Sequence, residues 1–351
     1  MSINFIKPAR LKPGDKVAII SPSSGCAYLY PAVYAWGLER LRTIFKLEPV
    51  EFPTTRKSPE YLSQNPQARA EDINNAFKNP EIKAIIATTG GNDQIRILKY
   101  LDNEAIKNNP KIFMGYSDCT NLHLYLWNLG IISYYGGSII SQFAMQGSMH
   151  EYTVDAIRKA LFEDTIGPVF PSQFYTDYDL DWSDESLLTH NRPVEPNIGW
   201  EWHNWNNQVI QGRLWGGCLE ILDLHLAVDR YLPQLNQLEN SILFIETSEE
   251  LPTSGFVYRF VAALAEKNML DKFSALLVGR PKAQFLHMLP PEGKEQFIKN
   301  QEQGIKKALE DYGSLLPVVF NMDFGHTDPQ LILPSGGSIT IDSRNRQITL
   351  G

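Results

Sequence analysis

Three residues, Ser117, Glu246 and His326, have the types and the chain order that catalysis by a serine nucleophile requires. A serine hydroxyl is a poor nucleophile until an imidazole takes its proton. That imidazole needs a carboxylate to fix its tautomer and to stabilise its charged form. Each of the three lies at the end of a strand-like run, so the sequence predicts a Ser-His-Glu triad.

The surroundings of Ser117 support this role. The segment KIFMGYSDCTNLHLYLW, residues 111–127, is typical of a strand, a sharp turn and a helix, with Ser117 at the turn. Such a nucleophile elbow lifts the hydroxyl out of the sheet and leaves the next backbone N–H groups at the positive end of a helix, where they can hold an oxyanion. The string is not G-x-S-x-G, however, and Ser117 or Asp118 could simply cap the helix.

Structural roles are also open to the other two residues. Glu246 closes the strand in SILFIETSEE and could open a helix through the acidic run at 249–250. His326, in NMDFGHTDPQLILPSG, could be an ordinary loop histidine. The joint placement of the three residues favours a catalytic site.

The elements that must position these residues alternate between strands and helices. Short β-branched runs are followed by turns and then by apolar residues at three- and four-residue steps, which predicts parallel sheets covered by helices. Expected strands are 17–20, 48–52, 84–88, 112–114, 131–135, 209–214, 242–245, 276–278, 318–320, 338–341 and 347–350. Expected helices are 32–45, 68–77, 94–101, 121–129, 256–267 and 295–312.

A chain of 351 residues predicts about two domains, and the texture changes between them. We expect a nucleophile-bearing α/β domain at 1–165, a linker with a tryptophan-bearing loop at 166–207, and a second α/β domain at 208–351 that carries Glu246 and His326. The linker is rich in proline and contains four tryptophans. These either contact a ligand or only pin the loop to the surface.

Composition excludes several classes of protein. With 43% hydrophobic and 21% charged residues, the chain has the composition of an ordinary globular protein. The 32 basic and 40 acidic residues give a net charge of −8, which argues against nucleic acid and membrane partners. Cys26, Cys119 and Cys218 form no C-x-x-C pair, and the sequence contains no H-E-x-x-H. We therefore expect no metal, no disulfide framework and, without a secretion signal or membrane span, a cytoplasmic protein.

Motifs along nearly the whole chain resemble the LD-carboxypeptidase family of serine peptidases, which includes murein tetrapeptide carboxypeptidases and microcin C self-immunity peptidases. They are LKPGDKVAIISPSS, ARAEDINNAF, IIATTGGND, GYSD, GRLWGGCLEIL, ILFIETSEE, LLVGRPK and DFGHTDP. The resemblance implies that Ser117 is the nucleophile and that Glu246 and His326 complete the triad. It also implies an oxyanion hole made by the backbone N–H groups of Gly91 and Asp118.

The same resemblance implies a flavodoxin-like N-terminal domain with a parallel sheet, a smaller C-terminal mixed α/β domain, an active site in the cleft between them, no cofactor and a homodimer. The insertion at 167–207 is similar to the tryptophan-bearing loop of the microcin C immunity branch, in which aromatic residues pack on the nucleoside of a peptidyl adenylate; Trp182 and Trp200 match best. A small peptide or peptidyl-nucleotide substrate follows. Release of D-alanine from a murein tetrapeptide is the alternative activity, and a non-catalytic small-ligand binding protein is the alternative class.

Overall fold

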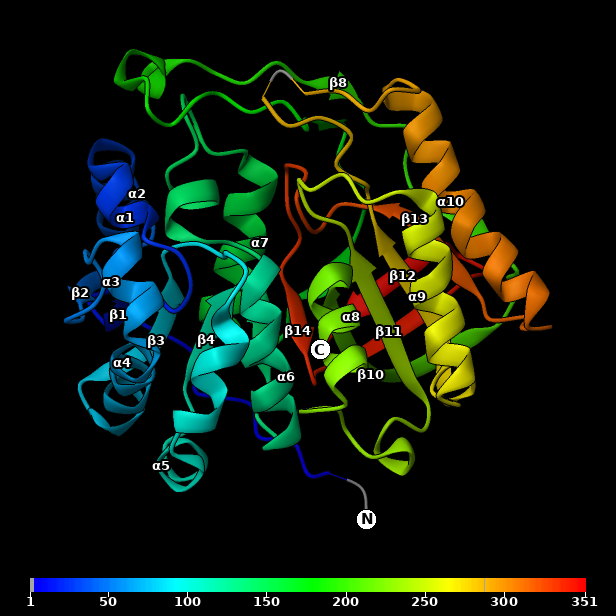
Figure 1. Ribbon diagram of the computed structural model, residues 1–351, viewed down its shortest axis with the longest axis horizontal. Coiled ribbons are helices and arrows are strands. Elements are labelled where there is room, and N and C mark those ends of the chain that lie inside the picture. The colour runs from blue at the N-terminus through cyan, green and yellow to red at the C-terminus, as the bar shows by residue number, and fades with distance from the viewer. Residues whose placement is uncertain (1–2, 287) are drawn as a thin grey trace.

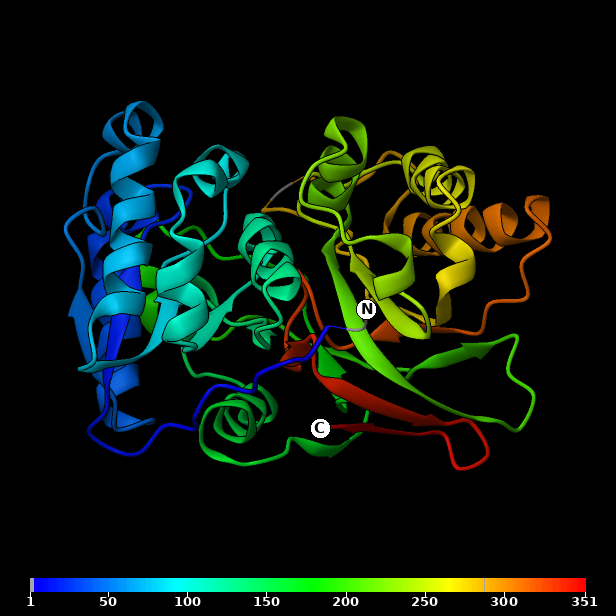
Figure 2. The ribbon, with the colours of Figure 1, turned by 90° about the horizontal axis from the view of Figure 1, so that it is seen from below.

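The structure is a computed structural model that describes residues 3–286 and 288–351. Two open sheets stand side by side, each flanked by helices (Figures 1 and 2). The predicted fold class, an α/β protein with a flavodoxin-like N-terminal parallel sheet and a C-terminal mixed α/β domain, is confirmed.

The first sheet has six strands in the order β14-β5-β4-β3-β1-β2. Its strands are β1 Lys16–Ile20, β2 Glu48–Glu51, β3 Ile82–Ala87, β4 Ile112–Gly115, β5 Ser133–Tyr135 and β14 Leu333–Ser335. The order 2-1-3-4-5 of the five parallel strands is that of flavodoxin-like folds, in which ligands bind at the carboxyl ends of the strands. Strand β14 joins antiparallel to β5, so the chain beyond residue 330 returns to complete the first sheet.

The helices around the first sheet follow from the apolar periodicity of the crossover segments. They are α1 Cys26–Leu29, α2 Pro31–Thr43, α3 Pro59–Gln64, α4 Pro66–Lys78, α5 Asn103–Asn108, α6 Thr120–Asn128 and α7 Glu151–Phe162. The helix expected at 94–101 is a 3₁₀ helix, η1 Gln94–Tyr100, and the π-helical turn η3 Ile139–Phe143 follows β5.

The second sheet has eight strands in the order β6-β16-β15-β10-β11-β12-β13-β9. They are β6 Gly167–Val169, β9 Glu201–His203, β10 Val209–Cys218, β11 Ser241–Glu246, β12 Phe273–Gly279, β13 Val318–Met322, β15 Ser338–Asp342 and β16 Gln347–Leu350. Only β10 to β13 run parallel, with the others antiparallel at the edges. The α-helices described in this half are α8 Leu219–Val228, α9 Ser254–Glu266 and α10 Lys294–Asp311.

The segment expected as a linker is partly regular. It contributes β6 and β9 to the second sheet and forms a small ribbon of its own from β7 Phe174–Tyr175 and β8 Glu195–Pro196. Figure 1 shows this segment crossing the top of the molecule from the α2 side to α10. Contacts at both ends agree, because Trp182 packs against Tyr30 and Glu195 pairs with Lys294.

Helix α6, which follows the Ser117 turn, locks the two halves together. The indole N–H of Trp127 donates to the Leu214 carbonyl (3.1 Å), and the hydroxyl of Thr120 accepts from the Cys218 backbone N–H (2.9 Å). Trp127 is buried in one apolar cluster with Trp215 and Leu219 of the second half. These contacts therefore fix the position of the first sheet relative to the second.

No helix within the described ranges is long and apolar enough to cross a membrane.

Candidate active site

Ser117 lies where the first sheet gives way to a helix. Strand β4 is buried along its whole length, and its chain enters η2 Ser117–Cys119 and then α6. Ser117 has φ = 62°, a left-handed conformation that costs a non-glycine residue roughly 1–3 kcal/mol. The sharp turn predicted for this serine is therefore present.

Asp118 secures the elbow to the loop that follows β3. Its buried carboxylate accepts hydrogen bonds from the backbone N–H groups of Asp93 (3.0 Å) and Gln94 (2.9 Å), and from the hydroxyl of Ser23. Burial raises the pKa of this carboxyl group, and the hydrogen bond from Ser23 opposes that change. The side chain of Asp118 thus ties the elbow to the loop that follows β3, which contains Gly90 and Gly91.

The glycine loop approaches the elbow too closely for a side chain. A Cβ on Gly90 would lie 2.8 Å from the Cβ of Ser117, 3.0 Å from its Oγ and 3.2 Å from the backbone N of Asp118. Gly90 and Gly91 both line the same pocket as Ser117. Two backbone segments therefore meet around the serine hydroxyl, as an oxyanion hole requires.

Glu246 and His326 come together at the carboxyl ends of two parallel strands of the second sheet, β11 and β13. Glu246 ends β11 with a fully buried side chain, and its Oε2 lies 2.6 Å from Nδ1 of His326, four residues beyond β13. Gly325 permits this approach, since it has φ = 99° and a Cβ there would lie 2.7 Å from the Cβ of Glu246. The glycine of the DFGH motif is therefore needed for both space and backbone conformation.

Tyr135 connects the two halves of the site. Its hydroxyl accepts from the backbone N–H of Ser117 (3.2 Å) and donates to Oε1 of Glu246 (2.5 Å). Burial and the nearby Glu246 carboxylate raise the pKa of this phenol well above its usual value, so Tyr135 remains a donor. The carboxylate of Glu246 is thereby occupied on both oxygens and fixed toward the histidine.

A second carboxylate, that of Glu249, faces the other ring nitrogen. Its Oε2 lies 3.2 Å from Nε2 of His326. Burial lowers the pKa of His326, but the charges of Glu246 and Glu249 outweigh it and raise the pKa to about 9. The two carboxylates therefore favour the protonated form of the imidazole.

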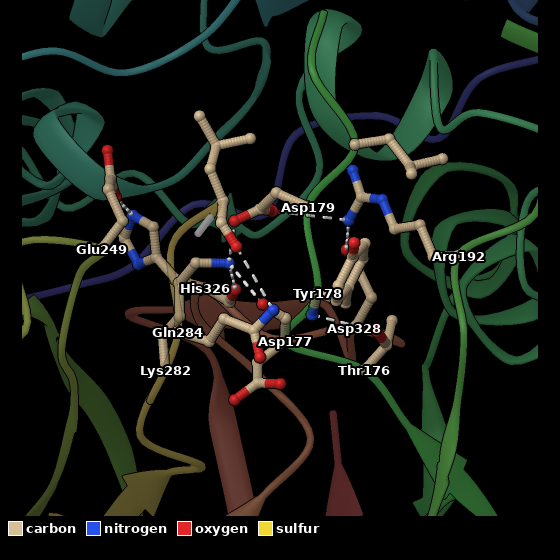
Figure 3. A network of polar contacts seen from close by, with 12 residues as sticks. Thr176, Asp177, Tyr178, Asp179, Arg192, Glu249, Lys282, Gln284, His326 and Asp328 are labelled. Atoms are coloured by element: carbon tan, nitrogen blue, oxygen red, sulfur yellow. Dashed lines mark hydrogen bonds and ion pairs between the residues drawn. The ribbon is translucent and has the colours of Figure 1, made fainter. Parts of the chain in front are cut away.

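Ser117 and His326 open into one pocket of about 240 Å³ between the halves. Lys282 and Arg192 also line it, and both are nearly buried and already paired: Lys282 lies 2.8 Å from Asp179, and Arg192 lies 2.9 Å from Asp328. Figure 3 shows this network beside the His326–Glu249 pair. Both cations of the pocket are therefore already neutralised by neighbouring carboxylates.

The two predicted tryptophans occupy different positions. Trp182 lines the pocket, and its ring meets that of Tyr30 edge-on with centroids 5.5 Å apart. Trp200 is buried, and its indole N–H donates to Asp323 (2.9 Å), three residues before His326. Trp200 is not among the residues that line the pocket, so its place is that of an anchor for the His326 loop.

Sequence reasoning missed Tyr135, Glu249, Lys282 and Arg192. Tyr135 ends a strand beside the one that precedes Ser117, which was a usable signal for a site residue. Glu249 appeared only as part of an acidic run. Lys282 and Arg192 lie in irregular segments, and no local pattern marks them.

Within residues 3–286 and 288–351, no group of three or more His, Cys, Asp or Glu side chains is placed to hold a metal ion.

A serine at a strand–turn–helix junction and a carboxylate-bound histidine share a pocket between two α/β halves, an arrangement typical of hydrolases. Two family models match the chain: the LD-carboxypeptidase N-terminal domain over residues 17–136 and the LD-carboxypeptidase C-terminal domain over residues 211–341. The chain belongs to the LD-carboxypeptidase family.

Relatives cover the chain almost completely. A Vibrio cholerae protein named as a carboxypeptidase is 30% identical over 97% of this chain and 96% of its own length. The Escherichia coli microcin C7 self-immunity protein MccF is 28% identical over 97% and 94%. A Bacillus subtilis protein named as a murein peptide carboxypeptidase is 25% identical over 98% and 94%.

Solved structures agree with the fold. MccF in complex with aspartyl sulfamoyl adenosine superposes with a TM-score of 0.84 at 27% identity, over 98% of this chain and 97% of that one. An MccF-like protein from Streptococcus pneumoniae in complex with AMP gives 0.84 at 27% identity, over 96% and 99%.

Proposed function

We propose that this protein is a metal-independent serine carboxypeptidase that hydrolyses the amide bond of aminoacyl or peptidyl adenylate-like substrates through an acyl-enzyme. The observation that carries the proposal is the 2.6 Å contact between Glu246 and Nδ1 of His326, in the pocket that also exposes Ser117. Nδ1 is thereby committed to the carboxylate, so Nε2 is the nitrogen that must exchange a proton with Ser117 during the reaction.

Ser117, His326 and Glu246 each have a separate role in the proposed reaction. The Oγ of Ser117 attacks the carbonyl carbon while Nε2 of an unprotonated His326 accepts its proton, and Glu246 stabilises the resulting imidazolium. The carbonyl oxygen becomes an oxyanion held by the backbone N–H groups of Asp118 and Gly91. His326 returns the proton to the departing nitrogen, the C–N bond breaks, and a water activated by the same imidazole then releases the acyl group from Ser117.

The pocket supports a nucleoside-bearing substrate. Trp182 and Tyr30 present aromatic surface at its wall, and base stacking on such rings contributes roughly 1–3 kcal/mol. Binding of aspartyl sulfamoyl adenosine by MccF and of AMP by the Streptococcus pneumoniae protein points the same way.

Release of terminal D-alanine from a murein tetrapeptide is the second candidate, favoured by the murein peptide carboxypeptidase relative. Such a substrate brings a free carboxylate that needs a cation. The pocket's Lys282 and Arg192 are already paired with Asp179 and Asp328, which weighs against this reading.

The test compares the two substrates on one preparation. The protein is incubated with an aminoacyl sulfamoyl adenosine and, separately, with a murein tetrapeptide ending in D-alanine, and products are followed by mass with Ser117→Ala as the blank. We expect hydrolysis of the adenosine compound. Hydrolysis of the tetrapeptide alone would assign the murein activity, and turnover of neither would contradict the proposal.

A further inference from the structure

The nitrogen that must receive the proton of Ser117 lies within ion-pair distance of a second carboxylate in this structure. Nε2 of His326 faces the Glu249 carboxylate at 3.2 Å, while Nδ1 faces Glu246 at 2.6 Å. Carboxylates beside both ring nitrogens favour a proton on each of them, and an imidazolium has no lone pair with which to accept another. The resting site is therefore assembled but not ready to act as a base.

The two carboxylates differ in how firmly they are held. The Glu246 side chain is fully buried and is also bound by Tyr135, whereas 43% of the Glu249 side chain is exposed and it lines the pocket. A half-exposed ion pair contributes little to stability and is readily exchanged for another partner. Glu249, which Figure 3 shows beside His326, is thus the member that a ligand can draw away.

The other groups around His326 are more distant, uncharged or already paired, so the charge of Glu249 decides whether Nε2 is protonated. Glu220, on α8, adds a more distant negative charge, and the ring of Tyr116 packs edge-on against the imidazole with centroids 5.0 Å apart. The ammonium of Lys282 lies near the His326 carbonyl (3.5 Å), but it is paired with Asp179.

The charge of the pocket indicates what could take Glu249. Besides His326, four carboxylates and two cations line the pocket, namely Asp179, Asp181, Glu249, Asp328, Arg192 and Lys282. Because acids outnumber bases, the pocket attracts a positive group more than a negative one. The α-ammonium of an aminoacyl substrate is two bonds from the carbonyl carbon that Ser117 attacks, so it arrives close to Nε2 and hence to Glu249.

We propose that Glu249 is a specificity-determining residue that keeps His326 inactive until the free ammonium group of the substrate pairs with the Glu249 carboxylate and draws it from Nε2. This inference rests on the function proposed above. Once Glu249 leaves, the Nε2 proton passes to solvent water, and the neutral nitrogen can then accept the proton of Ser117. Among the proposed substrates, aminoacyl compounds with a free α-amine are thereby preferred over peptidyl compounds, in which that amine is acylated and which are hydrolysed more slowly.

The sign of the pH effect follows. Only neutral His326 acts as the base, so kcat/KM of the resting enzyme rises with pH through the pKa of this residue, which lies at about 9. Removing the charge of Glu249 lowers that pKa and moves the rise to lower pH. A shift of one pH unit changes the neutral fraction, and so kcat/KM at pH 7, about tenfold.

The test uses Glu249→Gln, which keeps the size of the side chain and removes its charge. Glu250→Gln is the matched control, because Glu250 is exposed and is not among the residues that line the pocket. Each protein is assayed from pH 6 to 10 with an aminoacyl sulfamoyl adenosine and with the same compound N-acetylated. For Glu249→Gln we expect the acidic limb to move down, the acetylated substrate to improve at pH 7, and the preference for the free amine to fall about tenfold.

A readout without turnover separates failure of this inference from failure of the proposed function. The pKa of His326 is measured by NMR titration of the imidazole ¹⁵N signals in Ser117→Ala, with and without Glu249→Gln, and with and without the free-amine compound. We expect the Glu249 change and the ligand each to lower that pKa, and the ligand to have little further effect once Glu249 is changed. An unchanged His326 pKa in the Glu249 variant, or an unchanged preference between the two substrates, would overturn the role of Glu249 whatever the protein hydrolyses.

Discussion

The two sheets furnish the site in different ways. The first sheet supplies Ser117 and the glycine loop through backbone conformation, since a left-handed serine, an adjoining glycine and the buried Asp118 fix where N–H groups and hydroxyl lie. The second sheet supplies Glu246 and His326 through charge, with contacts of 2.6 and 3.2 Å to two carboxylates. The first half therefore fixes the positions of the serine hydroxyl and the N–H groups, and the second half sets the proton affinity of His326.

The largest effects are expected where the two halves meet. We expect Ser117→Ala and His326→Ala each to lower turnover by up to ~10⁶ and Glu246→Ala by about 10⁴, with the protein still folded and with double variants no worse than the worst single one. Steady-state rates and circular dichroism on the same samples check this. Additive losses in the double variants would mean that the halves act independently.

Gly90→Ala tests the backbone half alone. The added Cβ would meet Ser117 at 2.8 Å, and the backbone of Gly90 needs no unusual φ, so the effect is steric and local. We expect kcat to fall by about 10², as for a displaced nucleophile or a lost oxyanion donor. Gly255→Ala is the control, because a Cβ there meets nothing closer than 3.6 Å; equal losses in both variants would refute the close approach at Gly90.

Variants of Trp182 and Trp200 distinguish a residue that contacts the ligand from one that anchors a loop. Trp182→Ala should cost about 5- to 150-fold in kcat/KM for the adenosine substrate while sparing a minimal peptide. Trp200→Ala removes a buried indole that is bound to Asp323, and we expect it to cost about 3–5 kcal/mol of stability. Thermal melts and kcat/KM with both substrate types distinguish the two, and equal losses on both substrates for Trp182→Ala would make it an anchor as well.

No effect is expected from chelation. Incubation with EDTA, followed by assay with and without added zinc, should leave kcat/KM unchanged, because the proposed chemistry uses a side-chain nucleophile. Activity lost to the chelator and restored by zinc would shift the account to metal-activated water.

The sequence was sufficient for the half that depends on local pattern. Buried β-branched runs and turn glycines predicted the parallel strands of both sheets, and KIFMGYSDCT predicted the turn at Ser117 because strand, turn and helix are contiguous there. Strands β6, β9 and β14 were not predicted, since their pairing partners are distant in sequence. Helix α7 was also not predicted, although its buried residues recur at three- and four-residue steps.

The charge-based half could be foreseen only in part. Glu246 and His326 lie at strand ends, where site residues are expected, but Glu249 faces Nε2 only because the loops after β11 and β13 fold onto each other. Trp182 and Trp200 share one composition-biased segment, and which of them reaches the pocket depends on tertiary contacts with Tyr30 and Asp323.

The central claim, a covalent intermediate on Ser117 served by His326, is tested most directly by locating the acyl group. An aminoacyl sulfamoyl adenosine is mixed with the enzyme, the reaction is quenched in acid within the first turnover, and the digested protein is mapped by mass spectrometry. The account predicts the acyl group on the peptide that contains Ser117, and its absence in Ser117→Ala. Cys26 also lines the pocket, but burial raises the pKa of its thiol and keeps it protonated, so an acyl group found on Cys26 would contradict the account.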